Sequence, residues 1–387
     1  MKNQKICIIG GGLAGLTTAI ALSKLGCQID LITSNQGMNI KMSNRTTAIS
    51  ENNYNFLKKL DISKNLQKDM WASSKMKLYT ENSKKEVSEI FELDNERKNK
   101  NVLYMFENSK IIKHMINKIK KIKNINVIQN KKISEIKDEG LLKSIKLNNY
   151  NFKYNLIIIC AGSNSILTKK LFKDQEIHSP YNELSFTTIL KHSYLKNNIT
   201  RQLFLDDEIL ALLPLSNTKT SIVWSIKKHM KPNNKVLKKK IKFFGNIFLK
   251  KIVFSNSIEY KDLNFLLRKK YYRDRILLFG DALHVIHPFV GQGFNMILRD
   301  LISLSKILKS KINLGLDIGS PDILSEFTNE TKSHNFAFAI STDIIKNSFS
   351  IKNSYYKKIR NDLFKNINRN NFVKDIFFNI ADKGLKF

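Results

Sequence analysis

The sequence predicts an α/β protein with a Rossmann-like domain, an inserted antiparallel β-sheet and a helical C-terminal region. Three observations support this fold class. A strand, a glycine-rich turn, a helix and a second strand follow one another within residues 5–32. The hydrophobic period changes to two between residues 185 and 226, and helical segments rich in lysine and aromatic residues fill residues 313–387. Alternating β and α elements predict a parallel sheet, whereas a series of period-two segments predicts an antiparallel one.

The length and composition of the chain indicate a two-domain globular protein. The 387 residues exceed one typical compact core, and a hydrophobic content of 42% excludes a disordered chain. Lysine and arginine number 66 against 33 acidic residues, which gives a net charge of +33. Because the basic residues are spread along the chain, we interpret the excess as drift in amino-acid usage, with weak attraction to an anionic membrane surface as a by-product. Nucleic-acid binding is not expected.

The three cysteines, Cys7, Cys27 and Cys160, predict buried thiols in a reducing compartment. None forms a CxxC pair, so neither a disulfide framework nor a metal site is expected. The N-terminus leads directly into a strand and no apolar run is long enough to span a bilayer, so neither a signal peptide nor a membrane span is expected. These features favour a cytoplasmic protein and leave peripheral contact with the inner membrane face open.

The first chemical signal is the glycine-rich turn of the N-terminal unit. Residues 5–9 form a buried strand, residues 14–25 have helical periodicity and residues 28–32 form a second strand. The G-x-G-x-x-G pattern permits a tight turn, close approach of a pyrophosphate to the backbone, and close packing of the helix on the strand. The helix N-terminus offers free N–H groups and the positive end of its dipole to phosphates. The unit predicts dinucleotide binding by Gly10, Gly12, Leu13, Ala14 and Gly15.

One element of the dinucleotide site is missing. The acid that binds the ribose hydroxyls is expected at the end of the second strand, where Thr33 and Ser34 stand. Asp30 lies three residues before Thr33 and on the opposite face of the strand. Either a hydroxyl group makes a weaker bond to the ribose, or the adenosine end is held less firmly.

The middle of the chain alternates between pieces of the two domains. From Arg45 a loop is predicted to run into a helix, and residues 185–226 read as antiparallel strands with turns at residues 206–207 and 216–217. The other predicted elements are a helix at residues 103–122, strands at residues 125–129 and 155–160, and short antiparallel strands within residues 133–155.

The stretch 275–301 carries the second chemical signal. A strand of apolar residues 276–279 is followed by Asp281, and a helix begins after two glycines, Gly291 and Gly293. A strand-end carboxylate can accept hydrogen bonds from a polyol. Glycines at a helix start bring backbone N–H groups and the helix dipole against an electron-rich ring edge, where they stabilise negative charge. Together with the N-terminal glycine turn, these features suit one long ligand.

These motifs resemble those of the flavin-dependent aromatic hydroxylases, and within them the ubiquinone-biosynthesis hydroxylases. The sequence GDALHVIHPFVGQGFN is similar to the second FAD motif of that family, and ALLPL with SIVWS resembles its substrate-domain sheet. RTTAIS resembles the loop after the first FAD segment, ENSKIIKHM the helix after the first crossover, and STDIIKNSFS the start of the C-terminal tail. The resemblance covers nearly the whole chain and implies an FAD-binding domain of the glutathione-reductase type.

The resemblance implies a monooxygenase reaction. FAD is reduced by NAD(P)H and forms a flavin C4a-hydroperoxide with O2, and one oxygen atom is placed on the aromatic ring of a polyprenylated phenol. The implied partners are this phenol, O2 and other ubiquinone-biosynthesis proteins. One alternative is a non-catalytic FAD-binding or scaffold member of a biosynthetic complex. Another is a related flavin oxidoreductase that acts on a different aromatic or isoprenoid substrate.

The resemblance also implies roles for individual residues. Arg45, which is otherwise a solvated loop charge, and Asn108 are expected to line the FAD channel, and Asp281 to bind the ribityl chain. Two residues are expected at the catalytic centre: Pro288 beside the isoalloxazine ring, and His284 as a hypothetical proton relay for the phenol. The pyrimidine edge of the flavin is expected to meet Gly291, Gln292, Gly293, Phe294 and Asn295.

Three positions depart from the family pattern. Thr33 replaces the usual acid after the second strand, and the segment CAGSNSILTKK, residues 160–170, lacks the aspartate of the family's middle motif. Ile297 stands where a glycine is usual, two residues after Asn295. The missing aspartate weakens the expectation of NADPH use, and Ile297 adds bulk to the first turns of the flavin-facing helix.

The predicted domains are discontinuous in sequence, because segments of one domain interrupt the other. The predicted pieces are FAD-binding segments at residues 1–70, 101–170 and 268–312, a substrate domain at residues 71–100 and 171–267, and a C-terminal helical region at residues 313–387.

Several side chains have both a structural and a functional interpretation. His284 and His287 lack the Cys or carboxylate partners of a metal site, so packing near the flavin is expected and no metal is predicted. Trp224 and Phe204 suit the core of the sheet or, alternatively, a prenyl tunnel. An apolar helical stripe is expected to pack on the body of the protein or, alternatively, to contact a membrane; it consists of Tyr356, Ile359, Leu363 and Ile367.

Overall fold

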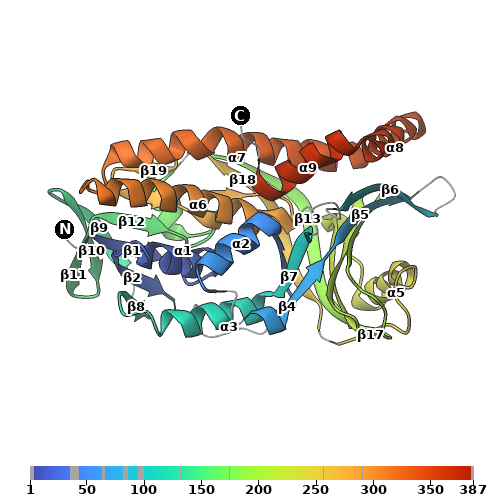
Figure 1. Ribbon diagram of the computed structural model, residues 1–387, viewed down its shortest axis with the longest axis horizontal. Helices are drawn as coiled ribbons and strands as arrows, with labels where there is room; N and C mark the ends of the chain where they lie inside the picture. Colours follow the sequence, from blue (N-terminus) through green and yellow to red (C-terminus); the bar gives the residue numbers. More distant parts are fainter. Residues whose placement is uncertain are drawn as a thin grey trace.

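The computed structural model shows an elongated molecule of two lobes, an α/β lobe that holds the N-terminus and a β-rich lobe that holds α5 (Figure 1). The predicted fold class, with an inserted sheet and a helical C-terminal region, is confirmed. The structure describes residues 4–34, 43–62, 66–81, 86–94, 100–130, 133–173, 175–255, 257–288 and 291–384.

The α/β lobe is built on a sheet of six described strands in the order β19-β20-β12-β1-β2-β8. Its neighbouring strands are parallel, except that β19 runs antiparallel to β20. Every residue of β12 and β20 is buried, which explains their uninterrupted apolar sequences. The strands are β1 (Lys5–Ile9), β2 (Gln28–Thr33), β8 (Ile125–Gln129), β12 (Leu156–Ile159), β19 (Tyr272–Arg273) and β20 (Ile276–Leu278).

Helices and strands share one hydrophobic core in this lobe. The helices that contribute to the core include α1 (Leu13–Ser23), α3 (Asn108–Ile119), α6 (Gln292–Asn313) and the first half of α7 (Pro321–Phe349). A short helix, α4 (Ile166–Leu171), follows β12. The predicted antiparallel strands within residues 133–155 are confirmed as β9 (Ile133–Glu139), β10 (Leu142–Leu147) and β11 (Tyr150–Tyr154).

Two of the predicted elements are wrong in type. The helix expected at residues 103–122 begins only at Asn108, because β7 (Leu103–Glu107) precedes it as the central strand of a small sheet, β3-β7-β4. The loop expected after Arg45 is strand β3 (Thr46–Ser50), which leads into α2 (Glu51–Lys59). The buried run of β7 is too short for its period to distinguish strand from helix. The remaining strand of this sheet is β4 (Met70–Ser73), which follows the short helix η2 (Gln67–Asp69).

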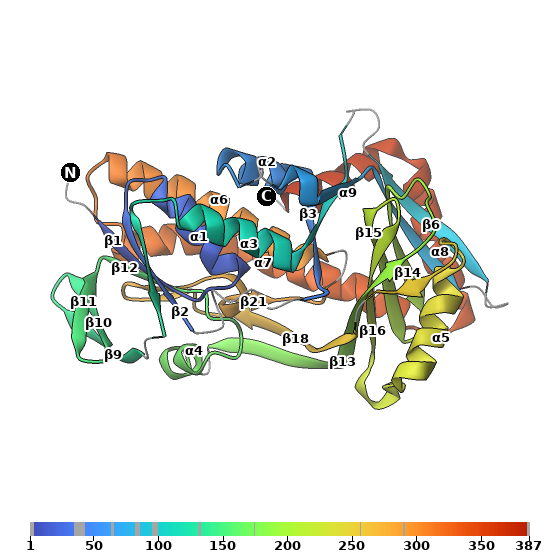
Figure 2. The same cartoon turned by 90° about the horizontal axis from the view of Figure 1, so that it is seen from below.

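The second large sheet forms the β-rich lobe and extends into the α/β lobe through β13 and β18 (Figure 2). The expectation of a purely antiparallel sheet is wrong at one pair, because β14 pairs with β5 in parallel. This pair arises where the β5–β6 hairpin, formed by residues 75–94, joins the strands from residues 176–227. The strands are β5 (Lys75–Glu81), β6 (Val87–Asp94), β13 (Glu176–Lys191), β14 (Ile199–Leu205), β15 (Glu208–Ser216), β16 (Lys219–Lys227), β17 (Val253–Phe254), β18 (Glu259–Arg268) and β21 (His284–Val285).

One face of this sheet is covered by α5 (Asn234–Gly245), which follows the short helix η4 (Lys228–Met230). Trp224 is fully buried and its ring contacts Phe244 of α5, whereas Phe204 stacks on Phe349 of α7 at 3.6 Å between ring centroids. The core interpretation of Trp224 and Phe204 is therefore the one that the packing supports.

The C-terminal helices α8 (Ser354–Arg369) and α9 (Asn371–Lys383) follow α7 and cross above β5 and β6 (Figure 1). The expectation that the predicted apolar stripe packs on the body is wrong for three of its four residues. Tyr356, Ile359 and Leu363 are exposed, and only Ile367 is half-buried against the core. The side of α8 that faces β6 carries Arg360 and Phe364 instead. No helix among the described residues is long and apolar enough to cross a membrane.

Candidate cofactor-binding site

Three neighbouring parallel strands of the first sheet end at one edge, and the candidate site lies there. β1 is followed by Gly10, β12 by Cys160, and β20 by the short helix η5 (Gly280–Ala282), which carries Asp281. In open α/β sheets, ligands bind at the carboxyl ends of the strands. The topology therefore brings the glycine turn and the distant GD motif together, as the sequence predicts.

The predicted glycines of the first turn fall into two kinds. A Cβ atom on Gly10 would lie 2.4 Å from the Cys160 carbonyl oxygen, and one on Gly15 would lie 1.9 Å from the Gly10 carbonyl oxygen. Gly12 is exposed, and a Cβ atom there would meet no atom within 4 Å. Gly10 is required by the close approach of the Cys160 backbone and Gly15 by the packing of α1 on Gly10, whereas Gly12 leaves room for a ligand.

The start of α1 is open to an anion. Gly12 is the N-cap residue of α1, and no side chain caps the helix. The first N–H groups of an uncapped helix have no intrahelical partner and can bind a phosphate group. Leu13 is half-buried and Ala14 is buried against the η5 turn, so both predicted residues shape this opening through their backbone.

Asp281 is exposed at the same edge. The preceding Gly280 has a φ of +66°, and a Cβ atom on it would lie 2.6 Å from the Cβ of Ala14. This close contact fixes η5 against α1, and it leaves the Asp281 carboxylate free to accept hydrogen bonds from a polyol. Ile297, the bulky departure from the family pattern, is buried beneath Gly280 and does not enter the edge itself.

The start of α6 forms a second opening with free N–H groups. Gly291, the N-cap residue, has a φ of 68°, and its Cβ would lie 2.8 Å from the Cβ of Ala48. A Cβ on Gly293 would meet no atom within 4 Å. Gln292 is buried and its Oε1 has no hydrogen-bond partner among the described residues, so a ligand N–H can satisfy it. Phe294 is buried in the hydrophobic core of the α/β lobe.

Asn295 has a structural position that differs from its expected contact with the flavin edge. Its side chain is fully buried, and its Nδ2 donates to the carbonyl oxygens of Ala48 and Gly291 at 3.0 and 3.3 Å. Its Oδ1 accepts from the Ser50 backbone N–H and from Asn53 Nδ2, both at 3.0 Å. With these bonds, Asn295 ties the start of α6 to β3 and α2, and it holds the second opening in place.

Arg45 and Asn108 lie side by side, although 63 positions separate them in the numbering. The Asn108 backbone N–H donates to the Arg45 carbonyl oxygen at 2.9 Å, and the Thr47 hydroxyl donates to Asn108 Oδ1 at 2.5 Å. The Arg45 side chain is partly exposed, with its Nε 3.8 Å from a carboxylate oxygen of Glu259. The structure brings the two residues together, and their contact with FAD stays a prediction.

His284 is held between α6 and α7. Its Nε2 contacts Asp300 Oδ2 at 2.6 Å, and Asn335 Nδ2 donates to the other carboxylate oxygen of Asp300 at 2.9 Å. Both His284 and Asp300 are buried. These contacts favour a structural role for His284, and the relay predicted for it has no supporting contact in the described part of the chain.

For His287 the sequence predicted only packing near the flavin, and the structure adds a carboxylate partner. His287 is buried directly before Pro288, which is half-buried, and its Nε2 contacts Glu183 Oε2 at 3.0 Å. Glu183 lies 104 positions away on β13, so no local pattern could connect the two residues. Phe289 and Val290, which follow Pro288 in the motif, lie outside the described residues.

The end of β2 is where an acid that binds the ribose was expected, and Asp30 and Thr33 are the two candidate side chains of this strand. Asp30 is buried and bonded to structural partners, because it contacts Lys5 Nζ at 2.8 Å and accepts from the Tyr154 hydroxyl at 2.8 Å. Thr33 is buried, and its Oγ1 has no hydrogen-bond partner among the described residues. Asp30 is therefore engaged inside the protein, and a ribose contact by the Thr33 hydroxyl stays a prediction.

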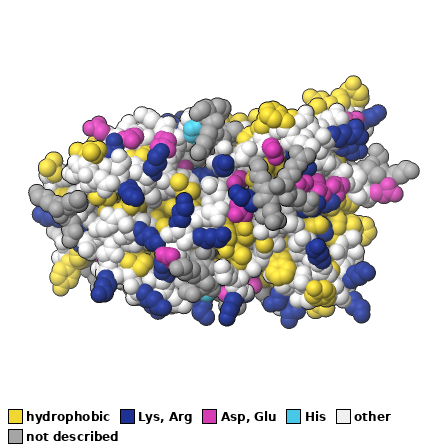
Figure 3. Space-filling model, in the orientation of Figure 1, with side chains coloured by type: hydrophobic (Ala, Val, Ile, Leu, Met, Phe, Trp, Pro, Cys, Tyr) yellow, Lys and Arg dark blue, Asp and Glu magenta, His cyan; other side chains and the backbone are white. Residues whose placement is uncertain are grey.

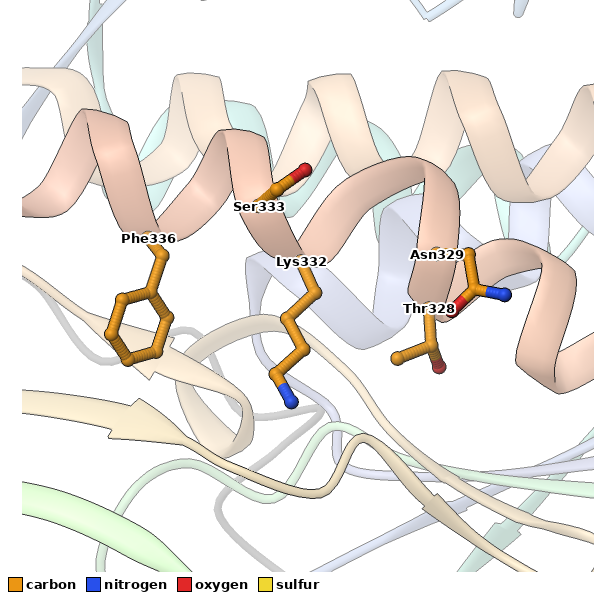
Figure 4. Close-up of a pocket in the computed structure, with 5 residues that line it drawn as sticks. All are labelled: Thr328, Asn329, Lys332, Ser333 and Phe336. Carbon is orange, nitrogen blue, oxygen red and sulfur yellow. The ribbon is translucent and has the colours of Figure 1, made fainter.

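Two cavities lie away from this edge. A cavity of about 360 Å³ lies on α7, where Thr328, Lys332 and Phe336 point toward the strands beneath the helix (Figure 4). A cavity of about 530 Å³ lies among α2, α6, α7 and α9. Neither cavity is lined by a predicted site residue. In the described part of the chain, no group of three or more His, Cys, Asp or Glu residues could hold a metal ion.

Comparisons with known proteins identify the family of the chain. Residues 3–335 match the FAD binding domain family. The chain is 26% identical over 295 residues to the ubiquinone biosynthesis monooxygenase COQ6, mitochondrial, of Dictyostelium discoideum. The matched region covers 64% of this chain and 59% of that protein. It is 27% identical over 176 residues to the ubiquinone hydroxylase UbiL of Rhodospirillum rubrum, over 44% of this chain and 41% of that protein. The chain spans about half the length of the curated relatives it matches.

Solved structures share the fold. The p-nitrophenol 4-monooxygenase PnpA from Pseudomonas putida DLL-E4 superposes with a TM-score of 0.79 at 16% identity, over 99% of this chain and 100% of that chain. Klebsiella pneumoniae HpxO complexed with FAD and uric acid gives a TM-score of 0.76 at 12% identity, over 99% of this chain and 98% of that chain.

The hydrogen-bonding groups at this site match those of FAD. Two uncapped helix starts with open glycines suit the pyrophosphate and an electron-rich ring edge, and the exposed Asp281 carboxylate suits a polyol. The unpartnered Gln292 Oε1 lies at the second helix start, where a ligand donor is expected. The geometry and the match over residues 3–335 lead to one conclusion: this chain belongs to the FAD binding domain family.

Proposed function

We propose that the protein is an FAD-dependent monooxygenase that hydroxylates the ring of a polyprenylated phenol in ubiquinone biosynthesis, with NAD(P)H as electron donor. The observation that supports this function most strongly is the strand edge that holds the open start of α1 and Asp281, together with the second open helix start at α6. The relatives named as ubiquinone hydroxylases support the choice of substrate class.

The residues of the chain then have defined tasks. Gly12 and the start of α1 bind the pyrophosphate, Asp281 binds the ribityl hydroxyls, and the α6 start stabilises negative charge at the pyrimidine edge. Pro288 packs beside the isoalloxazine ring. Bound FAD supplies the redox chemistry with O2, and the protein binds the two reactants, orients them and excludes water.

A test of this function uses purified protein that is loaded with FAD. We expect NAD(P)H-dependent O2 consumption to rise when a prenylated phenol is added, and the product to carry one oxygen atom from labelled O2. Flavin reduction that no phenol accelerates, together with no oxygenated product, would count against the proposal.

A non-catalytic FAD-binding role is the second candidate, because residues 160–170 lack the aspartate of the family's middle motif. In that case the protein retains FAD, does not turn over any phenol, and acts as a member of a biosynthetic complex. A related oxidoreductase with a different aromatic or isoprenoid substrate differs from both, because it would oxidise NAD(P)H with that substrate alone.

We further propose peripheral contact with an anionic membrane through the C-terminal helices. Hydrophobic side chains gather at the outer end of α8, next to lysine and arginine side chains (Figure 3). Such a face suits the interface of an anionic bilayer, where a lipid-like phenol would be found. The exposed large apolar side chains of α8 and α9 are Tyr355, Tyr356, Ile359, Leu363, Phe372 and Ile376.

The membrane contact is tested by sedimentation with anionic and neutral vesicles. Leu363→Glu is expected to reduce binding to anionic vesicles, and Leu141→Glu, at an exposed leucine of the β9–β10 turn, is the matched control. Equal loss in both variants, or binding that is insensitive to lipid charge, would contradict the proposal.

A further inference from the structure

A buried cluster of charged side chains lies beside the loop that leads into α6. Glu183 is its centre: one carboxylate oxygen contacts Lys346 Nζ at 2.8 Å and Lys227 Nζ at 3.0 Å, and the other contacts His287 Nε2 at 3.0 Å. The side chains of Glu183, Lys346 and His287 are at most 5% exposed. The cluster joins β13, the end of β16, α7 and the loop before α6 in one network.

A bulge in β13 aims Glu183 at this loop. The register of β13 against β18 shifts between Pro180 and Glu183, and Asn182 has a φ of 53°. Bulges re-aim side chains and are frequent beside active sites. Without this shift the strand would present a different residue to His287.

The cluster fixes the hydrogen positions on the imidazole ring. Burial opposes ionisation of Glu183, but the hydrogen bonds from His287 and Lys346 outweigh it and lower the pKa of the carboxyl group to about 2. The carboxylate is therefore an acceptor, and His287 Nε2 must carry the hydrogen of their bond. In the neutral ring, Nδ1 then holds a lone pair. Nδ1 is buried and has no hydrogen-bond partner among the described residues.

The other groups that face His287 do not compete for this nitrogen. Tyr181 contacts the ring edge-on at 5.3 Å between centroids, and Lys346 Nζ lies 4.0 Å from the centre of the Tyr181 ring. Burial, together with the charge of Asp343 and the hydrogen bond to it, raises the pKa of Tyr181, so its hydroxyl stays protonated. Burial lowers the pKa of His287 against the opposing bond to Glu183, so the ring is neutral near pH 7.

We propose that His287 Nδ1 is the base that accepts the proton of the substrate's phenolic hydroxyl. This inference rests on the proposed function, because it places the phenol beside Pro288, the next residue. The O–H bond breaks, the oxygen keeps the electron pair as phenolate, and the proton forms an N–H bond at Nδ1. Glu183 stabilises the imidazolium that results, as the carboxylate of a base–carboxylate pair does. A phenolate directs more electron density into the ring than a phenol does, which favours attack on an electrophilic oxygen.

The test uses 4-nitrophenol as a chromophoric probe, because its phenolate absorbs in the visible range and no turnover is needed. His287→Gln keeps an amide donor for Glu183 and removes the base, and His284→Gln makes the same change at the histidine bonded to Asp300. Each FAD-loaded protein is titrated with pH at saturating probe. In the wild type and in His284→Gln, the acid dissociation constant of the bound probe is expected to be at least tenfold larger than in His287→Gln. An equal ionisation midpoint in all three proteins would overturn the assignment.

A second measurement needs only the wild-type protein, in case His287→Gln does not fold. The probe is bound below its solution pKa in weak buffer with a pH indicator. The phenolate band is expected to appear without release of a proton, because the proton stays on His287. Release of one proton per phenolate formed would overturn the inference. A flavin-loaded protein that binds no nitrophenol would overturn the proposed phenol site itself, and the inference with it.

Discussion

The helices α1 and α6 both begin at an uncapped glycine, but different interactions hold the two helix starts in place. At α1, backbone packing alone sets the geometry, because Cβ atoms on Gly10 and Gly15 would collide with carbonyl oxygens at 2.4 and 1.9 Å. At α6, Gly291 has a positive φ, and side chains hold the loop from both sides: Asn295 ties it to β3, and His287 ties it to Glu183. Each start retains one open glycine, Gly12 or Gly293. The comparison separates glycines that build the fold from those that admit a ligand.

Gly15→Ala is expected to have the largest effect, because it breaks the packing that supports the first helix start. A methyl group 1.9 Å from the Gly10 carbonyl oxygen cannot be accommodated without moving α1. We expect a loss of about 3 kcal/mol or more in the free energy of unfolding, measured by denaturant titration. A variant as stable as the wild type would show that α1 is not held by this contact.

Glu183→Gln is expected to have the next largest effect, and it acts on the second helix start only. Removal of the carboxylate leaves the Lys346 ammonium buried without its counter-ion, at a cost of about 3 kcal/mol. Because the pKa of Glu183 is lowered from 4.5 to about 2, its contribution is complete above pH 4.5 and is lost as the pH falls toward 2.

The measurement for this variant is chemical denaturation of both proteins between pH 7 and pH 2. The stability difference between wild type and Glu183→Gln should shrink below pH 4.5 and approach zero near pH 2. A difference that does not change with pH would mean that the carboxylate of Glu183 is not what holds the loop.

Gly12→Ala tests the open glycine of the first start. No protein atom lies within 4 Å of the new methyl group, and the φ of −82° suits alanine, so stability should change by less than about 1 kcal/mol. The methyl group would instead meet the pyrophosphate, and we expect FAD affinity to fall by roughly 10- to 100-fold, which corresponds to about 1.4 to 2.8 kcal/mol. Equilibrium titration of the apoprotein with FAD gives the affinity. Unchanged affinity would mean that the pyrophosphate lies elsewhere.

Asp281→Ala is expected to have the smallest of these effects, because the side chain is exposed and contributes one group to a polyol. We expect a loss of roughly tenfold in FAD affinity and no change in the thermal midpoint. Asp281→Asn, which keeps one carbonyl acceptor, should lie between the two. Full flavin retention and activity in Asp281→Ala would remove the assigned role.

The first helix start was predictable from the sequence and the second only in part. Glycines at fixed spacing after an apolar strand are a local signal, and β1, α1 and β2 follow the predicted order. The His287–Glu183 contact depends on a bulge in β13 and on the register of β13 against β18, and neither is encoded by local periodicity. The strand β7 was missed for a related reason, because pairing on both sides replaces the alternation that marks a half-buried strand.

The three departures from the family pattern also have different consequences in the structure. Ile297 is buried and fits beneath η5, so it is compatible with the fold. At Thr33 a buried hydroxyl stands where an acid is usual. Asp30 forms an ion pair with Lys5 and accepts a hydrogen bond from the Tyr154 hydroxyl. The segment 160–170 contains no acidic residue, and Gly162 within it has a φ of +81°.

The visible absorption spectrum of the purified protein, after incubation with FAD and desalting, tests most directly whether FAD binds at the strand edge and at the two open helix starts. We expect a retained flavin band of about one FAD per chain in the wild type, and a strongly reduced band in Gly12→Ala at unchanged stability. A folded wild-type protein that retains no flavin, or a Gly12→Ala variant that retains as much as the wild type, would contradict this binding site.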